Sequence, residues 1–146
     1  MGYSYYRTVR LADTDAAGVI YFANLLNICH EAYEDCLGAV DLDWQNLLDA
    51  GEIALPIVHA EVDFLRPLRW GDRLTIKLFP VTEQPSQFTV RYQIFLENIE
   101  QPSSKPAAIA MTKHVAISPQ TRKRSPLPEI LKKWLKNAQK YPEQKN

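Results

Sequence analysis

One long segment of helical character, residues 20–37, constrains the fold more than any other part of the sequence. Apolar side chains recur along it at the three- and four-residue spacing of one helix face: Phe22, Leu25, Leu26, Cys29, Tyr33, Cys36 and Leu37. The opposite arc is polar and holds Asn24, Asn27, Glu31, Glu34 and Asp35, with His30 at its boundary. A helix with so wide an apolar stripe is mostly buried, so the rest of the chain must supply a surface that covers it.

Most of the remaining chain shows the two-residue alternation of β-strands. Five segments are predicted as strands: 4–11, 58–64, 74–78, 88–97 and 107–117. A short helix or turn is predicted over 44–50 and a short helix over 127–138. A turn is predicted between Pro80 and Pro85, and an exposed loop over 99–106. The order of one strand, one long helix and four successive strands predicts an α+β fold in which an antiparallel sheet of about five strands wraps around the helix. Such a sheet leaves an edge strand uncovered, which favours a homodimer or homotetramer.

Length and composition are typical of one globular domain. The chain has 146 residues, of which 46% are apolar and 23% are charged, and a chain of this size buries a core without needing disulfides or metals. We expect a single domain over residues 1–138 and a flexible C-terminal tail over residues 139–146.

Charge and cysteine content exclude several classes of protein. The 17 basic and 17 acidic side chains cancel, so no overall field attracts nucleic acid or an anionic membrane. No segment has the pattern of a secretory signal or a membrane span. Cys29 and Cys36 lie seven residues apart on the predicted helix, about 10 Å along its axis, which is too far for a disulfide. We therefore expect a cytoplasmic protein with neither nucleic acid nor a membrane as partner.

An acidic loop leads directly into the long helix, with the sequence Asp13-Thr14-Asp15-Ala16-Ala17-Gly18-Val19-Ile20-Tyr21-Phe22-Ala23-Asn24. The start of a helix presents unpaired backbone N–H groups and the positive end of the helix dipole, which stabilise negative charge on a nearby oxygen. Gly18 lets the backbone approach a ligand closely. The same residue types are also ordinary N-terminal caps, so the loop alone leaves two interpretations open, a catalytic carboxylate or a helix start.

The motif Asp13-Thr14-Asp15-x-x-Gly18-Val19-Ile20-Tyr21-Phe22-x-Asn24 resembles that of the hotdog-fold thioesterases, in the branch that includes 4-hydroxybenzoyl-CoA thioesterase. Pro67-Leu68-x-x-Gly71-Asp72, ahead of the next strand, supports the resemblance. The resemblance extends over nearly the whole chain and implies the hotdog fold and hydrolysis of an acyl-CoA thioester.

The resemblance also implies roles for individual residues. Asp15 would attack the thioester carbonyl or activate water, and the backbone N–H of Phe22 would polarise the carbonyl, with Gly18 shaping the loop between them. A thioester has a good leaving group, so one carboxylate and one preorganised donor can suffice without a Ser-His-Asp set, and no cofactor is expected. The chain has no Gly-x-Ser-x-Gly elbow. The three histidines show no metal-ligand spacing, and no metal is expected.

The acyl group is predicted from similarity along the whole chain. Within the family, the chain is most similar to the hydrolases of 1,4-dihydroxy-2-naphthoyl-CoA that act in phylloquinone synthesis. Tyr21 and His30 are the expected pocket residues. His30 stands where the hydroxybenzoyl-CoA enzyme has an acidic residue facing the ring hydroxyl, and an imidazole can bond a different aryl hydroxyl. His30 can equally be a helix-edge histidine without a ligand.

Coenzyme A carries phosphates that need local cations. The run Arg122-Lys123-Arg124 is the leading candidate because three cations cluster on a short loop, and Arg66, Arg69 and Lys105 are further candidates. Each of these side chains can also be an ordinary solvated charge.

Several other functions remain open from the sequence alone. An aliphatic acyl-CoA or acyl-carrier thioesterase would use the same Asp15, and a non-catalytic acyl-CoA-binding module of this fold would not need it. A hydratase would need a histidine with an acidic partner in the pocket; His59 and His114 both lie on predicted strands and are expected to be structural or surface residues. If Glu31 of the helix were the catalytic carboxylate, Asp15 would be only a cap.

Overall fold

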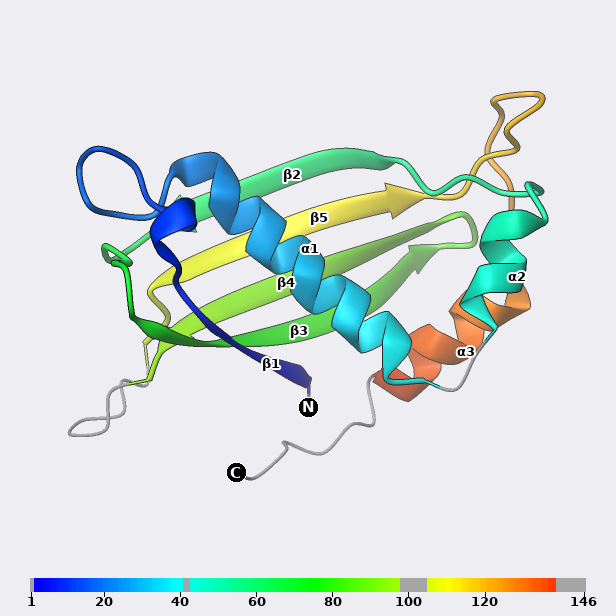
Figure 1. Cartoon of the computed structure of the whole chain (residues 1–146). Coiled ribbons are helices and arrows are strands. Elements are labelled where there is room, and N and C mark those ends of the chain that lie inside the picture. Colours follow the sequence, from blue (N-terminus) through cyan, green and yellow to red (C-terminus); the bar gives the residue numbers. More distant parts are fainter. Residues whose placement is uncertain (1, 41–42, 98–104, 139–146) are drawn as a thin grey trace.

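A five-stranded antiparallel sheet wraps around one long helix in the computed structural model, which describes residues 2–40, 43–97 and 105–138 (Figure 1). The elements in chain order are β1 (Tyr3–Thr8), the 3-10 helix η1 (Leu11–Asp13), α1 (Phe22–Gly38), α2 (Trp44–Asp49), β2 (Ile57–Phe64), β3 (Arg73–Gln84), β4 (Gln87–Leu96), β5 (Ala108–Val115) and α3 (Glu129–Ala138). The strand order across the sheet is β1-β3-β4-β5-β2. The predicted α+β architecture is confirmed.

The buried face of α1 forms the centre of the core, as its apolar stripe predicts. Six of its side chains are buried: Leu25, Ile28, Cys29, Ala32, Tyr33 and Cys36. They pack with the inward side chains of β3, β4 and β5, and Trp134 of α3 closes one end by donating a hydrogen bond to the Cys36 carbonyl at 3.2 Å. Both cysteines are free and buried, as expected for small apolar side chains.

Several predicted boundaries differ from the structure. The first strand ends at Thr8 rather than residue 11, because the chain turns into η1 once β1 has run the length of its pairing with β3. The long helix begins at Phe22 rather than residue 20, because the Ile20 N–H donates to the Leu68 carbonyl at 2.7 Å and Ile20 forms a bridge with Thr14. Pairing with β3 therefore sets the end of β1, and the tertiary contacts of Ile20 set the start of α1.

Strand β3 is longer than the predicted strand over 74–78, since it continues through Pro80 to Gln84. Its neighbour β1 pairs with it only as far as Leu78. Beyond Leu78, β3 has no strand on its β1 side. A proline at position 80, which has no N–H to donate on that side, therefore breaks no hydrogen bond of the sheet. The predicted turn is correspondingly confined to Pro85 and Ser86.

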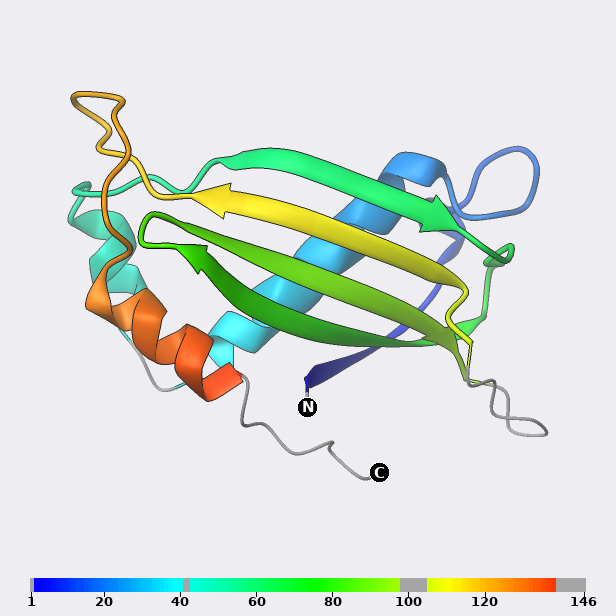
Figure 2. The ribbon, with the colours of Figure 1, turned by 180° about the vertical axis from the view of Figure 1, so that it is seen from behind.

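Strand β2 forms one edge of the sheet and pairs only with β5 among the described strands. Its residues are exposed except for half-buried Val62. Figure 2 shows the convex face of the sheet, which carries no helix in the described part of the chain. The predicted tail over 139–146 and most of the predicted loop over 99–106 lie outside the described residues.

Candidate functional site

The acidic segment forms a small closed loop, residues 13–21, at the start of α1. Here we call it the motif loop. The Tyr21 N–H donates to the Asp13 carbonyl at 2.8 Å, and the Asp15 N–H donates to the Val19 carbonyl at 2.9 Å. Gly18 has a φ of 79°, a left-handed conformation that suits glycine at the tip of the loop. These bonds hold both ends of the loop together and place Asp15 near its tip.

Asp15 is exposed and has a defined orientation, because its Oδ1 accepts a hydrogen bond from the Ala17 N–H at 2.9 Å. Phe22 is the first residue of α1, after the cap Tyr21. The N–H groups of the first helical residues have no acceptor within their own helix, and they lie at the positive end of its dipole. The motif loop therefore carries Asp15 and Gly18 and leads directly into Tyr21 and Phe22 at the N-terminus of α1.

Around the motif loop lies an exposed apolar surface. Tyr21 and Phe22 are 43% and 64% exposed, with ring centroids 4.8 Å apart. A pocket of about 270 Å³ adjoins them, lined by Val19, Ile20, Phe64, Leu65, Arg66, Pro67 and Leu68. Single chains seldom leave so many aromatic side chains exposed without a ligand or partner to cover them.

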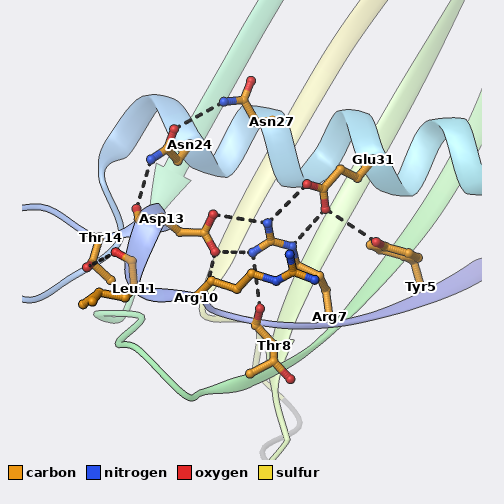
Figure 3. A network of polar contacts seen from close by, with 10 residues as sticks. All are labelled: Tyr5, Arg7, Thr8, Arg10, Leu11, Asp13, Thr14, Asn24, Asn27 and Glu31. Atoms are coloured by element: carbon orange, nitrogen blue, oxygen red, sulfur yellow. Dashed lines mark hydrogen bonds and ion pairs between the residues drawn. The ribbon is translucent and has the colours of Figure 1, made fainter.

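An ion-pair network below the motif loop was not predicted from the sequence (Figure 3). Arg7 of β1 binds two carboxylates, those of Asp13 and of Glu31 in α1. Tyr5 also approaches Glu31, at 3.5 Å. A signal for it exists in the sequence: Tyr3, Tyr5 and Arg7 alternate on one strand face, and Glu31 and Asp35 are four apart on the helix.

The Glu31 carboxylate lies in a different environment from that of Asp15. Its Oε2 accepts a hydrogen bond from Arg7 Nε at 2.9 Å, on the side of α1 that faces β1. The carboxylate neutralises a structural cation, which is a poor arrangement for a catalytic base. This geometry disfavours the alternative in which Glu31 replaces Asp15.

The three histidines have different environments. His30 is exposed on α1, about 12 Å along the helix from Phe22 at 1.5 Å per residue, with its ring 5.6 Å from Tyr33. His59 is exposed and pairs with Glu61 at 3.0 Å. His114 is buried, 2.8 Å from the Thr112 hydroxyl and stacked on Phe88 at 4.7 Å. The expectation that His59 and His114 are surface and structural residues fits these positions.

The basic run lies far from Asp15 within one chain. Arg122, Lys123 and Arg124 follow the end of β5, where Ile117 pairs with Ala54 just before β2. The motif loop lies beyond the other end of β2, where Val19 pairs with Arg69. The eight residues of β2 separate the two regions by about 25 Å (Figure 1). A single chain therefore does not bring the basic run to Asp15.

No group of three or more His, Cys, Asp or Glu side chains is arranged to hold a metal ion within residues 2–40, 43–97 and 105–138. None of the helices in those ranges combines the length and the apolar composition needed to cross a bilayer.

Comparison with known proteins identifies the family of this chain. A model of the thioesterase-like superfamily matches residues 9–135. The chain is 56% identical over 145 residues to the 1,4-dihydroxy-2-naphthoyl-CoA hydrolase of Picosynechococcus sp., covering 99% of each chain. It is 50% identical to the enzyme of the same name from Rippkaea orientalis, covering 92% of this chain and 96% of that relative.

A solved structure agrees closely with the fold. The 1,4-dihydroxy-2-naphthoyl-CoA thioesterase from Synechocystis superposes with a TM-score of 0.86 at 39% identity, covering 97% of this chain and 100% of that one. The chain belongs to the thioesterase-like superfamily, as a thioesterase with the hotdog fold.

Proposed function

We propose that the protein hydrolyses 1,4-dihydroxy-2-naphthoyl-CoA to the free acid and coenzyme A, as a step of phylloquinone biosynthesis in the cytoplasm. The observation that carries the proposal is the 56% identity to a hydrolase of that name over 99% of both chains. An exposed Asp15 carboxylate on the loop that leads into α1 supports it. The reaction needs water and no cofactor, because the thiolate of coenzyme A is already a good leaving group.

In the proposed mechanism, the backbone N–H of Phe22 binds the thioester oxygen and stabilises the negative charge that develops on it. The Ala17 N–H engages Oδ1 of Asp15, and we assign Oδ2 to the reaction. Asp15 either attacks the carbonyl carbon or removes a proton from the attacking water. Tyr21 and His30 belong to the acyl pocket, with the His30 imidazole available to bond a ring hydroxyl.

The substrate assignment is tested by comparing acyl-CoA thioesters. We expect kcat/KM for 1,4-dihydroxy-2-naphthoyl-CoA to exceed that for hexanoyl-CoA and palmitoyl-CoA by about 100-fold, because a site that hydrogen-bonds a ring hydroxyl discriminates against an acyl chain that lacks one. Release of free thiol measures all three reactions. A preference for an aliphatic thioester would replace this proposal with a general acyl-CoA thioesterase, and binding without turnover would indicate a non-catalytic module.

We further propose that two copies pair through β2, edge to edge and antiparallel. The exposed side chains of that strand include Ile57, Val58 and Phe64, an apolar edge that a partner strand would cover. An antiparallel pair places the start of one β2 beside the end of the other. The partner's basic run, 122–124, would then approach the motif loop and could bind the phosphates of coenzyme A.

Mixed dimers test this arrangement. Replacing Arg122, Lys123 and Arg124 with Ala should raise KM about 10-fold with little change in kcat, because the phosphates lie away from the reacting carbonyl. A dimer of one such subunit and one Asp15→Asn subunit, purified through two different tags, contains one site with both elements intact. We expect it to show about half the wild-type activity at low substrate concentration.

The two parent variants, each assayed alone, are the controls for the mixed dimer. If the basic run served its own chain, the mixed dimer would contain no intact site, and its activity at low substrate concentration would be about half that of the triple-Ala parent, or about 5% of wild type. Failure to recover any doubly tagged species would exclude the dimer itself.

A further inference from the structure

The guanidinium of Arg7 is fully engaged. Nε donates to Glu31 Oε2 at 2.9 Å, and Nη2 donates to Glu31 Oε1 and Asp13 Oδ1, both at 3.2 Å. Nη1 donates to Asp13 Oδ2 and to the Thr8 carbonyl, the latter at 3.3 Å. All five N–H groups of the side chain therefore have an acceptor. Arg7 is 12% exposed and Asp13 is 13% exposed, so solvent screens their ion pair weakly.

Asp13 connects this cation to the motif loop. Its carboxylate also accepts a hydrogen bond from the Arg10 N–H at 2.7 Å. Its backbone carbonyl accepts from the Tyr21 N–H at 2.8 Å and from Asn24 Nδ2 at 3.1 Å. One residue thus ties the beginning of the motif loop to its end and to the first turn of α1, two positions before Asp15 (Figure 3).

Arg7 fixes that residue from outside the loop. The side chain links three separate elements: β1, which carries it, the base of the motif loop through Asp13, and the middle of α1 through Glu31. Because Phe22 begins α1 and Asp15 lies on the loop, a shift of Asp13 relative to the helix changes the position of the carboxylate relative to the Phe22 N–H. An Arg side chain suits this task because its planar fork can pair with two carboxylates at once.

The ion pair is permanent near neutral pH. Partial burial opposes ionisation of Asp13, but the hydrogen bonds from Arg7 and from the Arg10 N–H outweigh it and hold the pKa of Asp13 below its usual value. Burial likewise opposes the charge of Arg7, and its hydrogen bonds to Asp13 and Glu31 outweigh this and keep its pKa above the usual value. The contact is a constant restraint rather than a titrating switch.

We infer that Arg7 is a positioning residue for hydrolysis: through Asp13 it sets the location of the Asp15 carboxylate relative to the helix N-terminus. The inference rests on the proposed function, in which Asp15 performs the chemistry. Arg7 itself touches neither substrate nor reacting atoms. Its effect belongs to kcat, because small errors in the placement of a reacting group slow the chemical step more than they weaken binding of the substrate.

The test compares four variants with 1,4-dihydroxy-2-naphthoyl-CoA as substrate: Arg7→Lys, Arg7→Ala, Asp13→Asn and the double variant Arg7→Lys/Asp13→Asn. We expect each single change to lower kcat about 30-fold with KM within about 3-fold of wild type. A lysine does not rescue, since one ammonium cannot form the two-sided fork. The kcat of the double variant should be no lower than that of the single variants, because both changes break the same Arg7–Asp13 contact.

Chemical rescue separates positioning from general stability. Guanidinium at a concentration well below the denaturing range should restore kcat of Arg7→Ala at least about 5-fold by occupying the vacated site. Arg91→Lys, on an exposed side chain of β4, is the matched control and should keep wild-type kcat and KM. If Arg7→Ala does not fold, Arg7→Lys and Asp13→Asn decide the question by the same criteria.

Unchanged kcat per folded enzyme in Arg7→Lys and Asp13→Asn, with only a lower melting temperature, would overturn the inference and leave Arg7 a stabilising residue. The inference would also be overturned if the fold-losses of kcat in the two single variants multiplied in the double variant. Failure of the proposed function is visible separately. If Asp15→Asn keeps wild-type activity, the proposed chemistry is wrong whatever Arg7 does, and if Asp15→Asn is inactive while the Arg7 variants are normal, only this inference fails.

Discussion

Replacing Asp15 with Asn should lower kcat by about 1,000-fold and leave KM within about 3-fold of wild type. The asparagine side chain has the same shape, and its amide oxygen can still accept the Ala17 N–H, so the motif loop keeps its conformation. What disappears is the negative charge that attacks the thioester or takes a proton from water, a loss that typically costs 100- to 10,000-fold in rate. Steady-state release of free thiol measures the effect.

Asp43→Asn is a matched control for this change. Asp43 Oδ1 accepts the Asn46 N–H at 3.0 Å as the cap of α2, so the same substitution preserves a similar bond away from the motif loop. We expect its kcat to equal that of wild type. If Asp15→Asn were equally active, Asp15 would be no more than a loop residue. A single turnover in ¹⁸O-labelled water then tests for nucleophilic attack. A mixed anhydride that water opens at Cγ of Asp15 leaves an unlabelled Asp15 oxygen on the product and the label on Asp15, whereas direct attack by water puts the label in the product.

The helix and the sheet that make up the fold were predictable from the sequence because each depends on a hydrophobic pattern that repeats along many residues. The apolar stripe of α1 and the alternation along the strands each involve many residues, so no single position decides the outcome. Element ends depend instead on individual tertiary bonds. Ile20 has the apolar character of the helix stripe, yet its N–H pairs with the Leu68 carbonyl and the helix begins two residues later.

The candidate site was predictable only where its parts are adjacent in sequence. Asp15, Gly18 and Phe22 lie within eight residues, two of them on the motif loop and the third at the start of α1. The Arg7 network joins residues 6 and 24 positions apart, and it depends on β1 taking the strand position beside β3, with its alternate side chains toward α1. Residue spacing does not determine the order of strands in a sheet, so the network became visible only in the structure.

The basic run, residues 122–124, is visible in the sequence, but its distance from the motif loop is not. Its composition predicts an anion site, but the antiparallel pairing of β2 with β5 places it at the end of the sheet opposite the motif loop. A sequence reports neither this separation nor a neighbouring chain that would close it. The proposed antiparallel pairing of two β2 strands reconciles the two observations, because it reverses the ends of one chain relative to the other.

Acid should destabilise the protein through His114. Burial lowers the pKa of this side chain from 6.5 to about 4, with a further contribution from His30. In the unfolded chain the imidazole takes up a proton below about pH 6.5, whereas in the folded chain it stays neutral until about pH 4. The unfolded state therefore binds more protons in this window, and stability is lost as pH falls through it.

From the two pKa values we expect the free energy of unfolding to fall by about 2 kcal/mol at pH 5 and about 3 kcal/mol at pH 4, relative to pH 7.5. Urea denaturation at fixed protein concentration measures this slope. In His114→Gln the amide can still bond to the Thr112 hydroxyl but does not titrate, so the variant should be less stable at pH 7.5 and lack this component of the slope. His59→Gln, which changes an exposed histidine, should keep the wild-type slope. An undiminished slope in His114→Gln would show that the buried imidazole does not control acid stability and would assign it to other groups.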